Sequence, residues 1–259
     1  MFTWLKTRRR RAIRERPWPV GWDEILRRNV RQMRWLDEAT GERLRGWIAV
    51  FVSEKSFEGC GGLEITDEVR VSIAAQAGLA VLGLEEQFYD RWRSVLVYPG
   101  DYLVPRSTAL EGGGELEWQE ARLGETWAGG SVVFSWPRVV EGGRLRDGPR
   151  SVVIHECAHA IDMLDGEIDG IPPLATARRA WAAGIAACRE RFEEALDDGR
   201  FTALDEYAAE GPGEFFAVAS ECFFQDPHRL IRSDRQLYDL LREAWRQDPQ
   251  ARMPVHPSR

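Results

Sequence analysis

Apolar residues recur at helical spacing through the first third of the chain. In residues 22–35 and again in residues 42–54, apolar side chains stand three or four positions apart, which is typical of an amphipathic helix. A third helix is expected through VRVSIAAQAGLAVLGL, with Asp67 as its cap. The glycine-rich stretch FEGCGGLEI, at 57–65, is expected to be a loop. This third is therefore predicted to be mostly helical.

The middle of the chain has the patterns of β-strands. SVLVYPG (94–100) is a β-branched run that ends in a Pro-Gly turn, ELEWQEARL (115–123) alternates, and GSVVFSW (130–136) is β-branched and aromatic. Between the first two, EGGGE (111–115) is typical of a loop. These segments predict a small mixed or antiparallel sheet of three or four strands.

Helical patterns return in the last part of the chain. A helix is predicted over about 148–164, a turn-rich loop over 165–174 and a long amphipathic helix over about 176–196. Two further helices are predicted at about 212–225, where a proline takes the first helical position, and at 234–247. No internal repeat or long linker interrupts this order, so one mostly helical α+β domain is the simplest account.

Charge is distributed unevenly along the chain. The net charge of the 259 residues is −7, yet residues 1–16 carry seven Lys or Arg and one Glu. A partly flexible, solvated arm over 1–18 is favoured over a segment that touches nucleic acid or anionic lipid, so direct nucleic-acid binding is not expected. We expect the α+β domain to cover 19–250, with the 44% of hydrophobic residues supplying its core, and the tail 251–259 to fray.

Nothing in the sequence indicates a membrane or an oxidising compartment. No apolar run reaches the roughly 18 residues of a membrane-spanning helix, and no apolar signal-peptide core follows the arginines at 8–11. The four cysteines are scattered without a CxxC pair, which is typical of reduced thiols. We therefore expect a cytoplasmic protein without a membrane partner.

The predicted helix at 148–164 contains IHECAH, a match to the pattern HExxH. Positions i and i+4 share a helix face, so His155 and His159 can direct ring nitrogens at one ion, and Zn²⁺ suits imidazole ligands. Glu156 can take a proton from a water molecule that the metal acidifies, as metallopeptidase chemistry requires. The alternative is a buried histidine pair in the core. Such a pair without partners would cost stability in so apolar a helix.

A catalytic zinc ion with two histidines needs a third protein ligand. The longer pattern HExxHxxGxxH is absent, and the remaining histidines, His228 and His256, lie in Pro-flanked loop or tail sequence. Carboxylates are better candidates. Glu214 and Glu221 are seven residues apart and lie on one face of the predicted helix PGEFFAVASECFF. A carboxylate in the first turn, such as Glu214, could also be there only to meet the helix dipole.

Three further features have two interpretations each. Asp162 follows His159 by three positions, and it could accept a hydrogen bond from a ligand's other ring N–H or begin the polar end of the helix. Tyr207, seven residues before Glu214, could donate to the oxyanion of a tetrahedral intermediate or be a packing residue. GSVVFSW (130–136) could be the edge strand that pairs with a peptide or an ordinary core strand.

Two segments that carry these residues resemble a known family. IHECAHAIDMLDGEIDGIP (154–172), followed by DEYAAEGPGEFFAVASECFF (205–224), resembles the Mlc titration factor A family of glucose-regulated metallopeptidases. GLEITDEVRVSIAAQA, VLVYPGDYLV and GETWAGGSVVFSW are also similar to that family, so the resemblance covers most of the chain. The zinc site of the family resembles that of the anthrax lethal factor catalytic domain.

The resemblance implies a role for each residue that matches the family's motif. His155, His159 and Glu214 would bind one zinc ion per chain. Glu156 would be the general base, and Tyr207 would match the tyrosine that stabilises the transition state. Glu221 would be a neighbour within or behind the shell of zinc ligands. Each role is an expectation that follows from the resemblance.

The resemblance also implies an activity and a partner. The implied activity is zinc-dependent hydrolysis of peptides or proteins, with aminopeptidase action on small substrates, and the implied partner is an Mlc-like transcriptional repressor of sugar uptake. The alternative is a regulatory binding protein that sequesters a transcription factor and whose zinc site is structural or of low activity. Glu156 argues against that alternative, since a structural zinc ion does not require this carboxylate.

Overall fold

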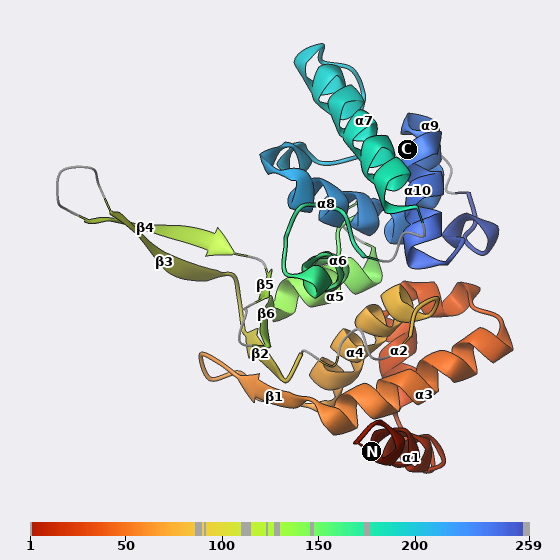
Figure 1. Ribbon diagram of the computed structural model, residues 1–259. Helices are drawn as coiled ribbons and strands as arrows, with labels where there is room; N and C mark the ends of the chain where they lie inside the picture. The colour runs from red at the N-terminus through yellow and green to blue at the C-terminus, as the bar shows by residue number, and fades with distance from the viewer. Residues whose placement is uncertain are drawn as a thin grey trace.

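Helices pack beside a small sheet, and the expected α+β class is confirmed (Figure 1). The computed structural model describes residues 2–85, 90, 92–109, 115–122, 124–126, 130–145, 148–173 and 177–255. The backbone alone is described for 2–3 and for the parts of 102–126 in that range. The domain limits at 19 and 250 remain a prediction.

The N-terminal third is helical, as the apolar spacing predicts. Its elements are α1 (Phe2–Arg14), α2 (Trp22–Asn29), the 3₁₀ turn η1 (Arg31–Trp35), α3 (Glu38–Glu54) and α4 (Asp67–Val81). The cap of α4 is Thr66, whose side chain accepts from the backbone N–H of Val69, rather than the expected Asp67. Asp67 occupies the first turn instead, where its charge meets the helix dipole.

Helix α1 occupies most of the segment expected to be a partly flexible arm over 1–18. Its residue Arg10 donates to both carboxylate oxygens of Glu54 on α3 and to Asp90, with its NH2 group 2.7 Å from Glu54 Oε2. Ile13 is buried between the two helices. The basic segment therefore packs on the body of the protein through one face, and Arg8, Arg9 and Arg11 lie on its exposed side.

Four strands form one sheet in the order β1-β2-β6-β5. Strands β1 (Ser56–Gly59), β2 (Ser94–Tyr98) and β6 (Ser131–Ser135) pair in parallel, and β5 (Gly124–Thr126) is antiparallel to β6. The sheet is thus mixed and mainly parallel. Strand β1 lies in the stretch that was expected to be a loop. The prediction missed it because four residues ahead of a glycine run are too few to show the alternation of a strand. Strand β6 is interior, so of the two interpretations of GSVVFSW the edge strand was wrong and the ordinary core strand is confirmed.

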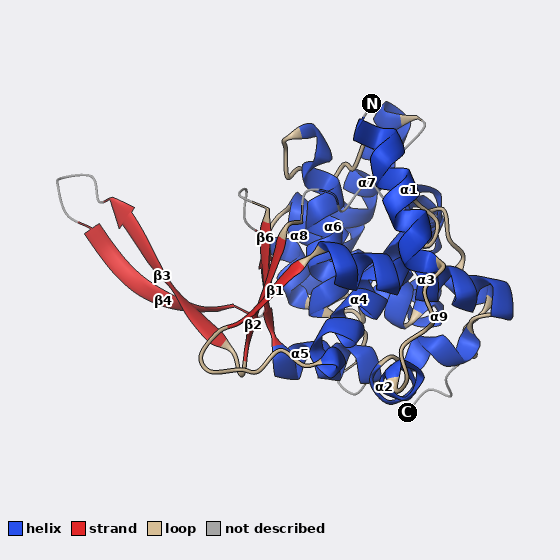
Figure 2. Cartoon of the chain, turned by 90° about the horizontal axis from the view of Figure 1, so that it is seen from below, coloured by secondary structure: helices blue, strands red, loops and turns tan. Residues whose placement is uncertain are grey.

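A two-stranded hairpin is inserted between β2 and β5. It consists of β3 (Tyr102–Ala109) and β4 (Glu115–Arg122), which pair antiparallel and project away from the body (Figures 1 and 2). Strand β4 confirms the strand expected at 115–123. The expected glycine-rich loop at 111–115 lies outside the described residues except for its last position.

The C-terminal half is helical. It contains α5 (Trp136–Arg144), α6 (Val152–Asp162), η3 (Met163–Asp165), α7 (Arg178–Asp197), η4 (Glu206–Glu210), α8 (Pro212–Gln225), α9 (Pro227–Ser233), α10 (Arg235–Trp245) and η5 (Pro249–Ala251). The short helices α5 and α9 were not expected. Helix α5 contains Gly142 and Gly143, which lower helix propensity but are required here, because a Cβ on Gly143 would overlap the carbonyl oxygen of Asn29.

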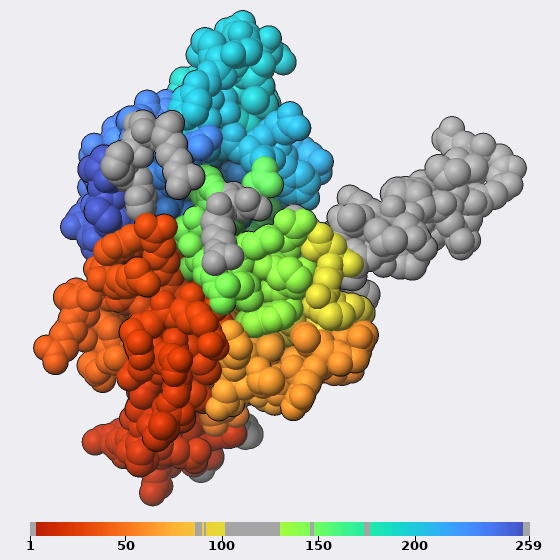
Figure 3. Space-filling view, turned by 180° about the vertical axis from the view of Figure 1, so that it is seen from behind, coloured from red at the N-terminus to blue at the C-terminus, as the bar shows by residue number. Residues whose placement is uncertain are grey.

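Helix α6 lies at the centre of the hydrophobic core. Helix α6 packs against α4, α8 and β5, and its residues Ile154, Cys157 and Ile161 are fully buried. Figure 2 shows the helices gathered on one side of the sheet, and Figure 3 shows the green residues between the red-orange N-terminal part and the blue C-terminal part. Among the described residues, no helix combines the length and apolar character needed to cross a bilayer.

Candidate metal centre

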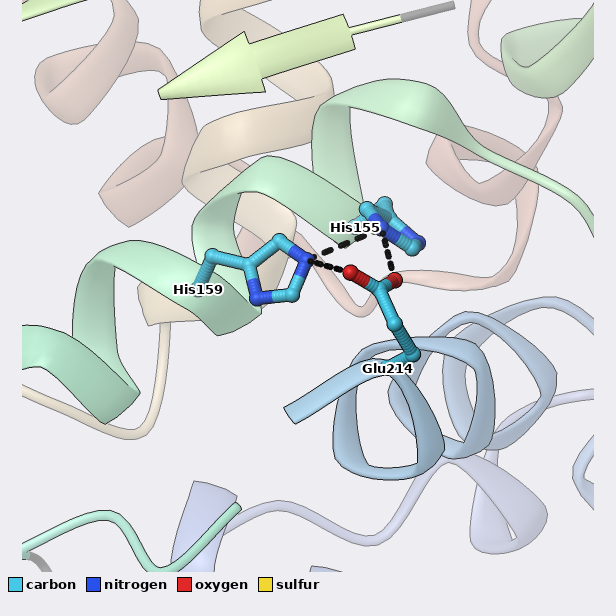
Figure 4. A group of neighbouring side chains, drawn as sticks. All are labelled: His155, His159 and Glu214. Carbon is cyan, nitrogen blue, oxygen red and sulfur yellow. Dashed lines mark hydrogen bonds and ion pairs between the residues drawn. The ribbon is translucent and has the colours of Figure 1, made fainter. Parts of the chain in front are cut away.

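Helix α6 places two histidine rings side by side. The helix begins after Ser151, whose hydroxyl accepts from the N–H of Ile154 and caps the first turn. His155 and His159 follow one turn apart on the same face, with their ring centroids 4.7 Å apart and their Nε2 atoms 3.0 Å apart (Figure 4). Both side chains are largely buried. Two ring nitrogens are therefore directed at one point.

Helix α8 brings a carboxylate to the same point. Its first turn begins at Pro212 and carries Glu214, whose Oε2 lies 3.1 Å from His155 Nε2 and whose Oε1 lies 3.4 Å from His159 Nε2 (Figure 4). One ligand-type atom from each of these three residues lies within 4.8 Å of the other two. Residues far apart in the sequence thus form a set of donors that could hold a metal ion.

The electrostatics of this set favour a cation. Burial would lower the pKa of His155, but hydrogen bonds with Glu214 and Glu221 outweigh it and raise that pKa to about 10. Burial would raise the pKa of Glu214, but both histidines lower it far below the ordinary carboxyl value. Glu214 Oε2 is buried without a hydrogen bond of good geometry. Two imidazoles and a carboxylate without a full set of hydrogen-bond partners fit a transition metal.

The second candidate carboxylate, Glu221, lies on the other side of His155. Its Oε1 is 2.8 Å from His155 Nδ1, and its Oε2 accepts from the backbone N–H of Ser151. The Ser151 hydroxyl in turn donates to Gln76 Oε1 at 2.9 Å. Glu221 therefore orients the His155 ring, while Glu214 faces the Nε2 atoms.

Sequence reasoning missed Ser151 and Gln76, although each leaves a signal. A serine immediately before an apolar helical run is a cap pattern. Gln76 is a fully buried amide in the apolar helix α4, and a buried polar side chain in such a helix usually has a partner elsewhere in the core. Gln76 also donates to Val139 O at 2.8 Å, which ties α4 to α5 behind the histidines.

Asp162 ends α6 and is fully buried, so it does not begin a solvated polar end. Its Oδ2 accepts from the backbone N–H of Gly170 at 2.8 Å, and its Oδ1 has no hydrogen-bond partner. His159 Nδ1 also lacks a partner, so the structure shows no hydrogen bond between the two side chains. Burial raises the pKa of Asp162 to about 6.

Glu156 and Tyr207 lie at the histidines in different environments. The Glu156 side chain is only 2% exposed, and its charge contributes to the raised pKa of His155. Tyr207 is 42% exposed, and its ring centroid lies 6.2 Å from that of His155. Asp205 caps the turn η4 through the N–H of Tyr207 and forms an ion pair with Arg150, which ties η4 to the start of α6.

The remaining histidines take no part in this cluster as far as the structure describes them. His228 lies in helix α9 rather than in the expected loop, and its Nε2 bonds to Met253 O at 2.9 Å. It therefore fixes the C-terminal segment to α9. His256 lies outside the described residues.

Comparisons with known proteins find similarity over most of the chain. The family model described as glucose-regulated metallo-peptidase M90 matches residues 4–246. An uncharacterized protein of Synechocystis sp. is 33% identical over 250 residues, which cover 95% of this chain and 90% of the relative. Proteins named Mlc titration factor A are similar as well. The one from Serratia proteamaculans is 30% identical over 84% of each chain, and the one from Yersinia pestis is 29% identical over 90% of this chain and 86% of its own.

Proposed function

We propose that this chain, which belongs to the M90 family of glucose-regulated metallopeptidases, is a zinc-dependent peptidase that binds its ion through His155, His159 and Glu214. The convergence of two Nε2 atoms and one carboxylate from α6 and α8 is the observation that carries the proposal. Zinc is the metal of choice because two imidazoles and one carboxylate suit it, whereas calcium and magnesium prefer sites made of oxygen atoms.

Each protein group has a separate task in the hydrolysis. When bound, the zinc ion polarises the substrate carbonyl and lowers the pKa of the attacking water. Glu156 takes the proton of that water and passes it to the leaving amine. The Tyr207 hydroxyl, at the exposed edge of the cluster, donates to the developing oxyanion. Glu221 accepts the Nδ1–H of His155 and so keeps the Nε2 lone pair directed at the cluster.

The proposal includes a strand with which the substrate backbone would pair. Strand β5, rather than β6, ends the sheet on the side of α6, and α6 packs against it. We infer that the peptide adds to β5 as a further strand, which would bring its scissile bond toward the histidines. Aminopeptidase action on short peptides belongs to the same proposal and rests on the family resemblance.

A second function concerns a partner protein. The similar proteins from Serratia proteamaculans and Yersinia pestis carry the name Mlc titration factor A, and each is about 30% identical to this chain over most of its length. By this similarity we propose that the chain also binds a transcriptional repressor of the Mlc kind. The four cysteines are free thiols, which is consistent with a reducing compartment such as the cytoplasm for both functions.

The variant Glu156→Gln tests the enzymatic proposal. It keeps the three ligands, so the zinc content should match that of wild type, while kcat on a peptide reporter should fall by about 10²- to 10⁴-fold because the base is removed. Zinc content by mass spectrometry and reporter cleavage check this. The control Glu64→Gln changes an exposed carboxylate and should leave both values unchanged.

Two results would redirect the proposal. A Glu156→Gln protein that retains zinc and full activity would exclude Glu156 as the base. Capture of an Mlc-like repressor by this variant, with no turnover by the wild-type protein, would make binding the main function.

A further inference from the structure

The loop formed by residues 165–173, which follows the motif helix, lies directly on the N-terminal end of α8. A Cβ atom on Gly213 would lie 2.6 Å from Ile168 Cγ2, and one on Gly170 would overlap the first carbonyl oxygen of α8. At Gly170 the overlap is with backbone, so only glycine fits there without displacing the loop, whereas at Gly213 the overlap is with the end of the Ile168 side chain, which would have to move. The loop therefore touches the residue that immediately precedes Glu214.

Polar contacts fix this loop at both ends. The backbone N–H of Gly170 donates to the buried carboxylate of Asp162 at 2.8 Å, and the left-handed φ of +72° at this position suits glycine. Arg178, at the start of α7, lies 2.6 Å from Asp165 Oδ2. Ile168 therefore lies between two residues of the loop, Asp165 and Gly170, that are held by polar contacts.

The side chain of Ile168 is apolar and exposed, and it lies against the first turn of α8, which carries Glu214. Seven large hydrophobic side chains are exposed among the described residues: Trp4, Leu5, Val20, Ile168, Phe201, Tyr207 and Val255. Tyr207 lies near His155 of the cluster, and Ile168 lies against Gly213, the residue immediately before Glu214. Ile168 is 52% exposed, so one part of it packs on α8 and the rest is available to a bound molecule.

We propose that Ile168 forms the apolar wall of a substrate subsite beside Glu214, so that the peptidase prefers an aliphatic side chain next to the scissile bond. This inference rests on the proposed peptidase function and names its substrate class. An aliphatic side chain that covers Ile168 removes apolar surface of both partners from water. A glutamine of similar length would leave part of its amide without a hydrogen-bond partner against the same wall.

The test compares kcat/KM for reporter peptides with leucine or glutamine at each position that flanks the scissile bond. Both side chains are uncharged, so the carboxylates of the loop do not distinguish them. Wild type should prefer leucine at one of these positions by about tenfold or more, and Ile168→Ser should reduce this preference to less than about threefold, mainly through KM. Val20→Ser, an exposed apolar residue ahead of α2, should keep the wild-type preference.

Binding of uncleaved peptides separates the subsite from the chemistry. The zinc-loaded Glu156→Gln protein should bind the leucine peptide about tenfold more tightly than the glutamine peptide in calorimetry, and adding Ile168→Ser should remove the difference. If that pattern appears while wild type cleaves nothing, the subsite stands and the peptidase function fails. If wild type cleaves peptides but Ile168→Ser leaves the leucine preference unchanged, or wild type has none, the subsite is overturned. Peptides that are neither bound nor cleaved overturn both.

Discussion

Two clusters of ionisable side chains in this protein differ in how their charges are arranged. Between α1 and α3, the guanidinium of Arg10 lies 2.7 Å from Glu54 and 2.6 Å from Asp90, and Lys6 also pairs with Asp90. We call these four residues the seam cluster. Its two cations and two carboxylates alternate, so each charge has an opposite neighbour, and the cluster is complete as it stands.

The cluster between α6 and α8 is arranged in the opposite way. The Nε2 atoms of His155 and His159 and the carboxylate of Glu214 converge on one point, and Glu221 adds a second carboxylate behind His155. No Lys or Arg takes part in the ion pairs of these residues that the structure describes. The alternating charges of the seam cluster hold two helices together, whereas the converging ligand atoms between α6 and α8 favour a bound cation. This difference distinguishes a structural cluster from a candidate metal site.

The largest expected effect is on metal retention. Glu214→Ala removes one of three ligands, and zinc content after dialysis should fall from about one ion per chain to below about a tenth. The matched change in the seam cluster, Glu54→Ala, should leave zinc content unchanged. Elemental analysis of both proteins measures the contrast. A Glu214→Ala protein that keeps its zinc, together with a Glu221→Ala protein that loses it, would show that the wrong carboxylate was assigned.

A smaller effect is expected at the carboxylate behind the histidine. Glu221→Ala leaves the three ligands in place but frees the His155 ring, so the affinity for zinc should fall by about 10- to 100-fold. Glu221→Gln should lose less, because its amide oxygen still accepts the Nδ1–H. Competition with a fluorescent chelator gives the affinities, and equal zinc affinity in wild type and Glu221→Ala would contradict an orienting role.

The seam cluster should respond in stability alone. Arg10→Ala leaves Glu54 and Asp90 without their shared cation, and the free energy of unfolding should fall by about 2 kcal/mol, less than for a fully buried pair. Arg11→Ala on the same helix breaks only the exposed pair with Glu15 and should cost less than about 0.5 kcal/mol. Chemical denaturation measures both values. A loss of zinc from Arg10→Ala would mean that the two clusters are coupled.

The smallest effect concerns Asp162, a buried carboxyl group near the site without a cationic partner. Its pKa in the folded protein is raised to about 6, so between about pH 4 and pH 6 the folded state binds more protons than the unfolded state. This contribution to stability is complete below about pH 4 and is lost as the pH rises through 6. A shift of about two pKa units corresponds to at most about 3 kcal/mol, and relaxation around the buried charge reduces this value. Metal-free Asp162→Asn should therefore exceed wild type in stability by about 1–2 kcal/mol at pH 7.5.

The pH dependence of unfolding provides the measurement for Asp162. The advantage of Asp162→Asn should disappear near pH 4, where the wild-type carboxyl group is neutral, and Glu64→Gln, at an exposed carboxylate, should show no such change. A constant difference across this range would exclude Asp162 as the titrating group.

The long amphipathic elements were predictable, and the short ones were not. Helix α8 was expected over about 212–225 and spans Pro212–Gln225, because a proline marks its first position and its apolar run is long. Strand β1 and helices α5 and α9 were missed, since four to nine residues hold too few periods to separate a pattern from chance. The interior position of β6 could not be predicted from the sequence pattern, because strand order depends on pairing between distant segments.

The sequence by itself determined that His155 and His159 share a helix face, because the i and i+4 positions are fixed by helix geometry. It also determined the family, which the match over residues 4–246 confirms. The helical spacing alone did not distinguish Glu214 from Glu221, since both lie on one face of the same helix, and the family resemblance favoured Glu214. The packing of α8 against α6 places the first carboxylate at the Nε2 atoms and the second, two turns later, at the Nδ1 atom of His155. The tertiary structure also placed Ile168 against Gly213 in the first turn of α8, because the loop that carries Ile168 packs on that turn.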